Sequence, residues 1–256
     1  MPRRLALVAA IAVGACGGSS STASPIDAAS RATQKATFVH VTLQAAIDSQ
    51  NVLVSDFSGA SDGSVGKGTI TVGGQDIAFI IATGHYFYGF ADLPAGISWV
   101  ELSAADVVSS GFDANSAAAF SSRELIALLR AKGAVLTKVG AEKLDTIAVT
   151  HYRGVTPAGN LVVGSGLSAN RRSQLVGLFG ASIPFDVWLD RQNRPRRLMY
   201  QADLAKAPNR PQGLATSGLL QYDISFRDWD TPVVASAPDA GATMSFADFQ
   251  ALHRQG

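Results

Sequence analysis

Cysteine is almost absent from this chain, which has a single one, Cys16, among its 256 residues. One cysteine cannot form an intramolecular disulfide, and this excludes a small scaffold stabilised by cross-links. The stability of the folded chain must therefore come from its core.

Charge of either sign is also scarce. Charged residues make up 16% of the chain, below the roughly 25% of an average globular protein, whereas hydrophobic residues make up 47%. The formal net charge is +1, and a near-neutral chain gives no argument for nucleic acid as a partner. Length and composition allow one large domain or two small ones, and the absence of a later linker-like stretch favours one apolar-rich domain.

The apolar run at the start of the chain, residues 5–15, is too short for a transmembrane helix, which needs about 20 residues. It follows Arg3 and Arg4, and this order is typical of a secretory signal peptide. The run ends in Val13-Gly-Ala-Cys16, which has the aliphatic, small, small, cysteine pattern of a bacterial lipobox. The alternative is an ordinary signal peptide that happens to contain a cysteine.

The lipobox predicts three regions in the chain. Residues 1–15 are a lipoprotein signal peptide, residues 16–30 are an acylated cysteine (with palmitate as an expected acyl chain) and a flexible Gly/Ser-rich tether, and residues 31–256 are a single domain with an irregular C-terminal tail. We therefore expect an extracytoplasmic protein, anchored to the cell membrane by a lipid on Cys16.

Most of the domain shows the two-residue alternation of β-strands, beginning with Val39, Val41 and Leu43 on one face of residues 36–44. Glycine-rich turns separate the strands, among them the hairpin turn Gly73-Gly74. Helical spacing is limited to a few segments, which are residues 25–35, 123–132, 168–179 and 246–252. The predicted fold class is α+β, a large curved antiparallel sheet with helices covering one face.

Catalytic motifs are either incomplete or in the wrong context. Gly59-Ala-Ser-Asp-Gly63 matches the G-x-S-x-G nucleophile elbow, but the helix that must follow the serine is replaced by a flexible turn. Lys67 lies in a glycine-rich stretch without the serine or threonine of a phosphate-binding loop. The four histidines have no metal-ligand spacing. We expect no catalytic residues, no metal and no cofactor.

Two features allow a functional and a purely structural interpretation. The segment Ile77–Ala82 is apolar at consecutive positions, as in a buried central strand or in the wall of an apolar cavity between sheet and helices. Arginines cluster at the turn around Arg191–Arg197, either as a solvated hairpin or as a basic rim that meets anionic lipid headgroups.

The order of these features resembles a known family. It runs from the lipobox through the strand Phe38-Val-His-Val-Thr-Leu and a leucine-rich helix to Val187-Trp-Leu-Asp-Arg-Gln-Asn-Arg-Pro-Arg-Arg-Leu and the closing strand Tyr222-Asp-Ile-Ser-Phe. Over about residues 30–240 the chain resembles the actinobacterial LppX/LprG-type (LppX_LprAFG) lipoproteins, which are similar in fold to the lipoprotein carrier LolA. The resemblance implies a half-barrel sheet closed by helices over a hydrophobic cavity.

The resemblance also implies a function, which is to bind and carry acylated lipid or lipoglycan without catalysis, with a lipid transporter as a further partner. The candidate cavity-lining residues are apolar and aromatic positions of the predicted strands and helices: Ile70, Val72, Phe79, Ile81, Tyr86, Tyr88, Leu125, Leu128, Leu129, Val149, Val187, Leu198, Tyr200 and Tyr222. The candidate headgroup-binding residues are Arg194, Arg196 and Arg197. Two rivals remain, a cargo-free envelope scaffold and an enzyme whose site gathers scattered residues such as His85, His151 and Asp190.

Overall fold

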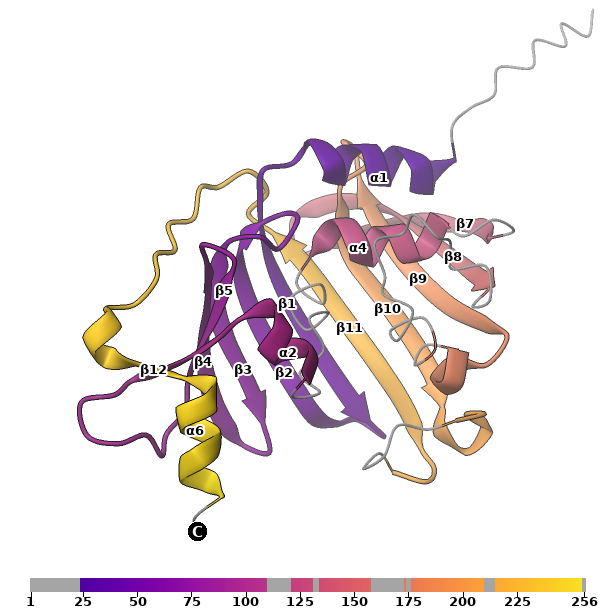
Figure 1. Cartoon of the computed structure of the whole chain (residues 1–256). Helices are drawn as coiled ribbons and strands as arrows, with labels where there is room; N and C mark the ends of the chain where they lie inside the picture. Colours follow the sequence, from indigo (N-terminus) through magenta and orange to yellow (C-terminus); the bar gives the residue numbers. More distant parts are fainter. Residues whose placement is uncertain are drawn as a thin grey trace, which may run out of the picture.

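The computed structural model describes residues 24–109, 121–130, 134–157, 173, 176–209 and 215–254. Over these residues the chain forms a twelve-stranded curved sheet with helices on one side of it (Figure 1). The strand order is β12-β6-β5-β4-β3-β2-β1-β11-β10-β9-β8-β7. All neighbours are antiparallel except β12 and β6, which are parallel. The large antiparallel sheet is confirmed.

The strands lie in the part of the chain that shows the β pattern, and β1 overlaps the predicted strand segment 36–44. Their bounds are β1 Phe38–Ile47, β2 Gln50–Ala60, β3 Gly66–Val72, β4 Gln75–Ala82, β5 His85–Gly89, β6 Trp99–Leu102, β7 Val135–Leu144, β8 Ile147–Pro157, β9 Ser182–Asp190, β10 Pro195–Asp203, β11 Leu219–Arg227 and β12 Thr243–Ser245.

Glycine and asparagine make two of the sharp turns between strands. Gly73 and Gly74, with φ of 59° and 80°, form the predicted β3–β4 hairpin turn in a region of backbone space that favours glycine. In the β9–β10 turn Asn193 has φ of 59°, and the Asp190 carboxylate accepts hydrogen bonds from the backbone N–H groups of Gln192 and Arg194. Such a side-chain cap is the usual role of aspartate in a turn.

The helices are short. Helix α1 covers Pro25–Lys35, and Ser24 caps it by accepting a hydrogen bond from the backbone N–H of Asp27. The domain therefore begins with this helix, ahead of the predicted boundary at residue 31, because Ile26 and Ala29 are buried in the core. The other helices are α2 Ala104–Ser109, α4 Ser122–Ala127 and α6 Phe246–His253, and the 3-10 helices are Leu128–Arg130, Leu204–Lys206 and Ala240–Ala242.

Two predicted features need comment. The C-terminal tail contains the predicted helix, which is α6, but it is not irregular up to that helix, because β12 joins the sheet beside β6. The predicted helix over residues 168–179 lies mostly outside the described residues, and residues 176–179 are helical.

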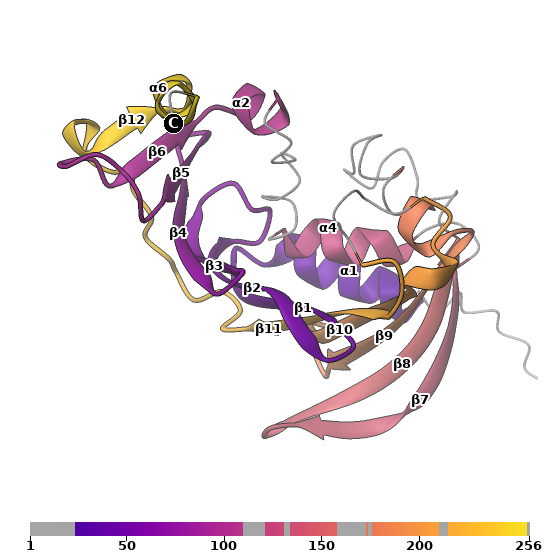
Figure 2. The same ribbon diagram turned by 90° about the horizontal axis from the view of Figure 1, so that it is seen from below.

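The sheet bends around the helices, which lie on one side of it (Figure 2). We call this side the helix face and the opposite side the outer face. Cross-strand partners share a face, so Val41 with Phe57 and Phe226 marks the helix face, and Thr42 with Asp56 and Ser225 marks the outer face. Helices α1 and α4 lie side by side over β1 and β9–β11.

Candidate functional site

The helix face carries the apolar core, divided into two main clusters. The first cluster joins α1 and α4 to strands β1 and β9–β11 and includes Ile26, Val41, Leu129 and Phe226. The second cluster joins β2, β4, β5 and β6 to α2 and α6 and is built around Phe79. The helix face is therefore the candidate site for an apolar ligand.

The predicted cavity-lining residues are divided between these clusters instead of surrounding one space. Leu125, Leu129, Val187, Leu198 and Tyr200 belong to the first cluster, with Tyr222 packed against it. Phe79, Ile81 and Tyr88 belong to the second, with Ile70 and Tyr86 packed against it. The side chain of Leu128 lies outside the described set.

Val149 lies apart from the other predicted lining residues. It is opposite Glu142 in β7 and Asp190 in β9, both on the outer face. Residues on its own side of β8 include His151 and Arg153, and this polar alternation is a sequence signal that marks the outer face.

Between the two clusters the helix face has an apolar strip that is only partly covered. It consists of two cross-strand pairs, Leu53 with Val72 and Ile70 with Ile77. Leu53 packs against the first cluster, Ile70 and Ile77 pack against the second, and Val72 is 45% exposed. This apolar strip connects both clusters on one surface.

A small cavity lies between the helices and the sheet at the start of α1. Its volume is about 210 Å³, and it is bounded by the helical residues Ile26 and Leu129 and by the strand residues Leu136 and Phe185, with Ser24, Asp27, Arg130 and Ala134 also in its wall. It is smaller than the roughly 300–1,000 Å³ of most small-ligand sites.

The three predicted headgroup-binding arginines lie away from the apolar strip and already have acidic partners. Arg194 pairs with Asp230. Arg196 and Arg197 border an outer-face pocket, where Arg196 pairs with Asp190 at 2.7 Å and Arg197 donates to Asp223 at 2.9 Å. The Asp223 hydrogen bond raises the pKa of Arg197. Because each arginine is already paired with a carboxylate, its charge is less available to bind a lipid phosphate.

Ser61, the serine of the G-x-S-x-G match, is wholly buried, so the prediction of a flexible turn is wrong. Its hydroxyl donates to the Ala36 carbonyl at 2.5 Å and accepts from Arg123 Nε at 3.1 Å. Its carbonyl accepts from Ser122 Oγ at 3.1 Å. Ser61 therefore ties α4 to the end of α1. A turn and strand β3 follow it, so the helix of a nucleophile elbow is absent there.

The outer face holds a polar network that the sequence did not predict. His151, which is buried, lies between Glu142 at 2.8 Å and Asp186 at 2.6 Å. Trp188 Nε1–H donates to Glu142 at 2.8 Å, and the guanidinium of Arg197 lies 5.1 Å from the Trp188 ring centre. The hydrogen bonds from Trp188 and His151 lower the pKa of Glu142.

Of the three residues suggested for a scattered enzyme site, two lie on adjacent strands and the third lies elsewhere. His151 and Asp190 both lie on the outer face of β8 and β9, whereas His85 lies in β5 beside Glu101, at 2.7 Å. Among the described residues no group of three or more His, Cys, Asp or Glu side chains is arranged to hold a metal ion.

No helix within the described ranges combines the length and the apolar character needed to cross a bilayer. No protein-family model matches the sequence, and no curated protein sequence matches it significantly. Comparison of structures is more informative.

The fold is similar to that of a solved bacterial lipoprotein. The chain is similar to lipoprotein LppX of Mycobacterium tuberculosis, with a TM-score of 0.51, 17% identity, and coverage of 83% of this chain and 96% of LppX. It is also similar to LprF of Mycobacterium bovis, with a TM-score of 0.47, 14% identity, and coverage of 84% and 95%. A LolA-superfamily protein of Nitrosomonas europaea follows, with a TM-score of 0.30, 10% identity, and coverage of 82% and 93%. The likeness to LppX confirms the predicted LppX-like fold.

Proposed function

We propose that this chain is a lipid-anchored extracytoplasmic protein that binds acylated lipid or lipoglycan against the helix face of its sheet and carries it without a catalytic step. The observation that carries the proposal is the apolar strip of Leu53, Ile70, Val72 and Ile77, which joins two core clusters but is incompletely covered. An exposed apolar surface that continues into a core is typical of a binding site.

An acyl chain matches this surface in both shape and chemistry. A cross-strand row on a sheet is long and narrow, and each CH₂ group removed from water contributes about 0.8 kcal/mol. A chain of many CH₂ groups would cover the strip and extend from the second cluster toward the first. Polar headgroups would remain in solvent at the end of the strip.

The anchor is the second part of the proposal. Fully extended chain spans at most about 3.5 Å per residue, so an acylated Cys16 would hold Pro25, the start of α1, within about 32 Å of the bilayer. The α1 end of the domain would then face the membrane from which lipid is taken. The shared fold with LppX, whose name describes it as a lipoprotein, supports this assignment.

Native mass spectrometry of the purified protein tests the cargo. We expect a bound species with the mass of a diacylated or multiply acylated lipid, lost when organic solvent strips the protein and regained with lipid vesicles. A protein that carries no lipid after purification, and takes none from vesicles, would favour the cargo-free scaffold. The packed first cluster and the small 210 Å³ cavity are the observations that favour the cargo-free scaffold.

A further inference from the structure

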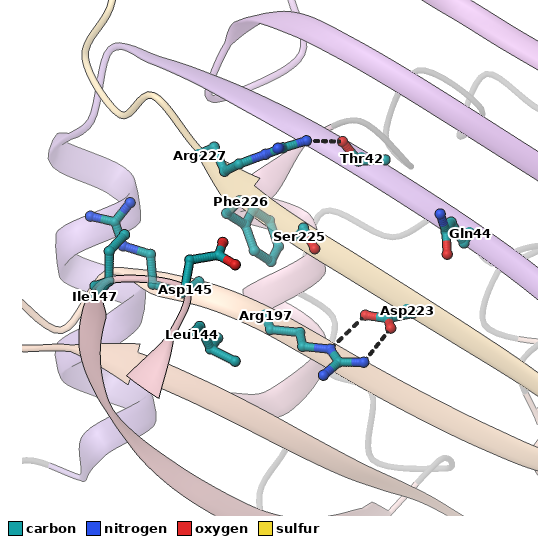
Figure 3. A pocket seen from close by; sticks show the side chains of 11 residues that line it. Thr42, Gln44, Leu144, Asp145, Ile147, Arg197, Asp223, Ser225, Phe226 and Arg227 are labelled. Carbon is teal, nitrogen blue, oxygen red and sulfur yellow. Dashed lines mark hydrogen bonds and ion pairs between the residues drawn. The ribbon is translucent and has the colours of Figure 1, made fainter. Parts of the chain in front are cut away.

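A second pocket lies on the outer face, opposite the helices (Figure 3). The tip of the β7–β8 hairpin, with Leu144, Asp145 and Ile147, turns over the outer face of β1, β10 and β11. A register shift between Lys138 and Gly140 marks a bulge in β7, and bulges bend strands in this way. The enclosed volume is about 350 Å³, within the usual range of small-ligand sites.

Most of the charge around this pocket is neutralised by the protein itself. Arg197 is held by two hydrogen bonds to Asp223, at 2.9 and 2.5 Å. Arg196 pairs with Asp190, whose side chain is only 7% exposed. These ion pairs carry no net charge, although their nitrogen and oxygen atoms can still form hydrogen bonds. The pocket therefore has no strong preference for an ion.

The remaining polar groups point to a particular ligand chemistry. Among the described residues the side chains of Gln44, Asp145 and Ser225 have no hydrogen-bond partner, and Arg227 donates a single hydrogen bond, to Thr42 at 3.1 Å. An amide and a hydroxyl both donate and accept, a carboxylate only accepts, and a guanidinium only donates. Both donors and acceptors therefore line the pocket (Figure 3).

We propose that this outer-face pocket binds a neutral, hydroxyl-rich ligand, specifically a saccharide unit. Each hydroxyl of a sugar donates and accepts at once, so different hydroxyls of one ligand can donate to Asp145, accept from Arg227 and pair with Gln44. The aliphatic side chains of Leu144 and Ile147 provide an apolar wall for the C–H face of the ring. An anion would be repelled by the carboxylate of Asp145, and a cation would be repelled by the guanidinium of Arg227. A neutral polyol has no charge, so neither repulsion applies to it.

The test is titration of the purified full-length protein, observed by ¹H–¹⁵N NMR, with methyl α-mannoside, trehalose and myo-inositol as probes. Inorganic phosphate and phosphocholine serve as anionic and zwitterionic comparisons. We expect a saccharide probe to shift the signals of the Gln44 side-chain amide and the Asp145 backbone. Gln44→Ala and Asp145→Ala should each weaken binding by about three- to tenfold, the effect of one lost hydrogen bond.

Gln201→Ala is the matched control, because Gln201 also lies on the outer face but pairs with Gln221 outside the pocket. It should leave the affinity unchanged. The proposal is overturned if no saccharide shifts these signals up to its solubility limit, if only phosphate or phosphocholine does, or if Gln44→Ala and Gln201→Ala behave alike. The pocket is on the face opposite the apolar strip, so none of these results affects the lipid proposal.

Discussion

His151 of β8 and Trp188 of β9 are cross-strand partners that stack face to face on the outer face of the sheet. Their ring centres are 4.3 Å apart and the ring planes are inclined by 13°. Glu142 of β7 contacts both, at 2.8 Å from His151 Nδ1 and 2.8 Å from Trp188 Nε1. One residue from each of three strands is thereby joined, and this network fixes the β7–β8 hairpin that encloses the outer-face pocket.

Because of this network, the free energy of unfolding should decrease at acidic pH. The hydrogen bonds from Trp188 and His151 lower the pKa of Glu142 from its ordinary value of 4.5. A lowered pKa in the folded state gives stability that is present above the ordinary value and lost as the pH falls through the folded value. We expect the urea midpoint of unfolding to fall between about pH 5 and pH 3, and to fall less in Glu142→Gln, whose amide oxygen still accepts from Trp188 but does not titrate. Equal pH dependence in the two proteins would contradict this role of Glu142.

Ser61→Ala should destabilise the protein. The substitution leaves the Ala36 carbonyl and Arg123 Nε each without one of their partners in a buried junction, which costs about 1–3 kcal/mol in the free energy of unfolding. Ser217→Ala, at an exposed position away from this junction, is the control and should change it by less than about 0.5 kcal/mol. A fluorophosphonate probe should not label Ser61 in the native protein; labelling would support the hydrolase alternative instead.

Gly66→Ala tests the packing of the second cluster. The ring of Phe57 lies over this glycine, and an added Cβ would come within 2.3 Å of Phe57 Cε2. We expect a loss of about 1–3 kcal/mol in the free energy of unfolding, measured by thermal or chemical denaturation. Gly140→Ala is the control, because a Cβ there meets nothing within 4 Å. A tolerated Gly66→Ala would mean that Phe57 does not occupy this position.

Val72→Asp tests the proposed lipid surface. Val72 is 45% exposed on the helix face, so the charge should be tolerated by the fold but should weaken lipid binding by roughly tenfold or more, because covering an unpaired carboxylate with an acyl chain is costly. Val155→Asp introduces the same change at a residue that is 42% exposed on the outer face. Lipid retention is measured by native mass spectrometry. If both variants lose lipid equally, the helix-face strip is not the binding surface.

Cys16→Ser tests the anchor. A serine hydroxyl does not accept the diacylglycerol, so the variant should lose metabolic labelling by palmitate and leave the membrane fraction or remain unprocessed. Wild-type protein labelled in parallel is the reference. Labelling and membrane partition that persist in the variant would refute the lipobox.

Sequence alternation predicted that most of the domain is antiparallel β-strand, since side chains on a half-buried strand alternate and glycine or asparagine marks two of the sharp turns. The pairing of β1 with β11 and of β12 with β6 was not predicted. That is why the hairpin at Gly73 and the turn at Asn193 were located correctly. It could not assign Val149, because alternation divides a strand into two faces without saying which face meets the helices. His151 and Arg153 lie on the same side of this strand as Val149, and their polar side chains indicate the outer face.

The sequence by itself determined that the domain is an antiparallel sheet, because strand alternation and turn residues depend on local composition and spacing. Its resemblance to the LppX/LprG-type lipoproteins also indicated the LppX-like fold. Only the tertiary structure decided that Ser61 is buried, that Arg194, Arg196 and Arg197 are paired with carboxylates, and that an outer-face pocket exists. Each of these depends on partners distant in the chain, as Arg123 is from Ser61 and Asp223 is from Arg197. Strand register and packing bring such partners together, and neither can be read from neighbouring residues alone.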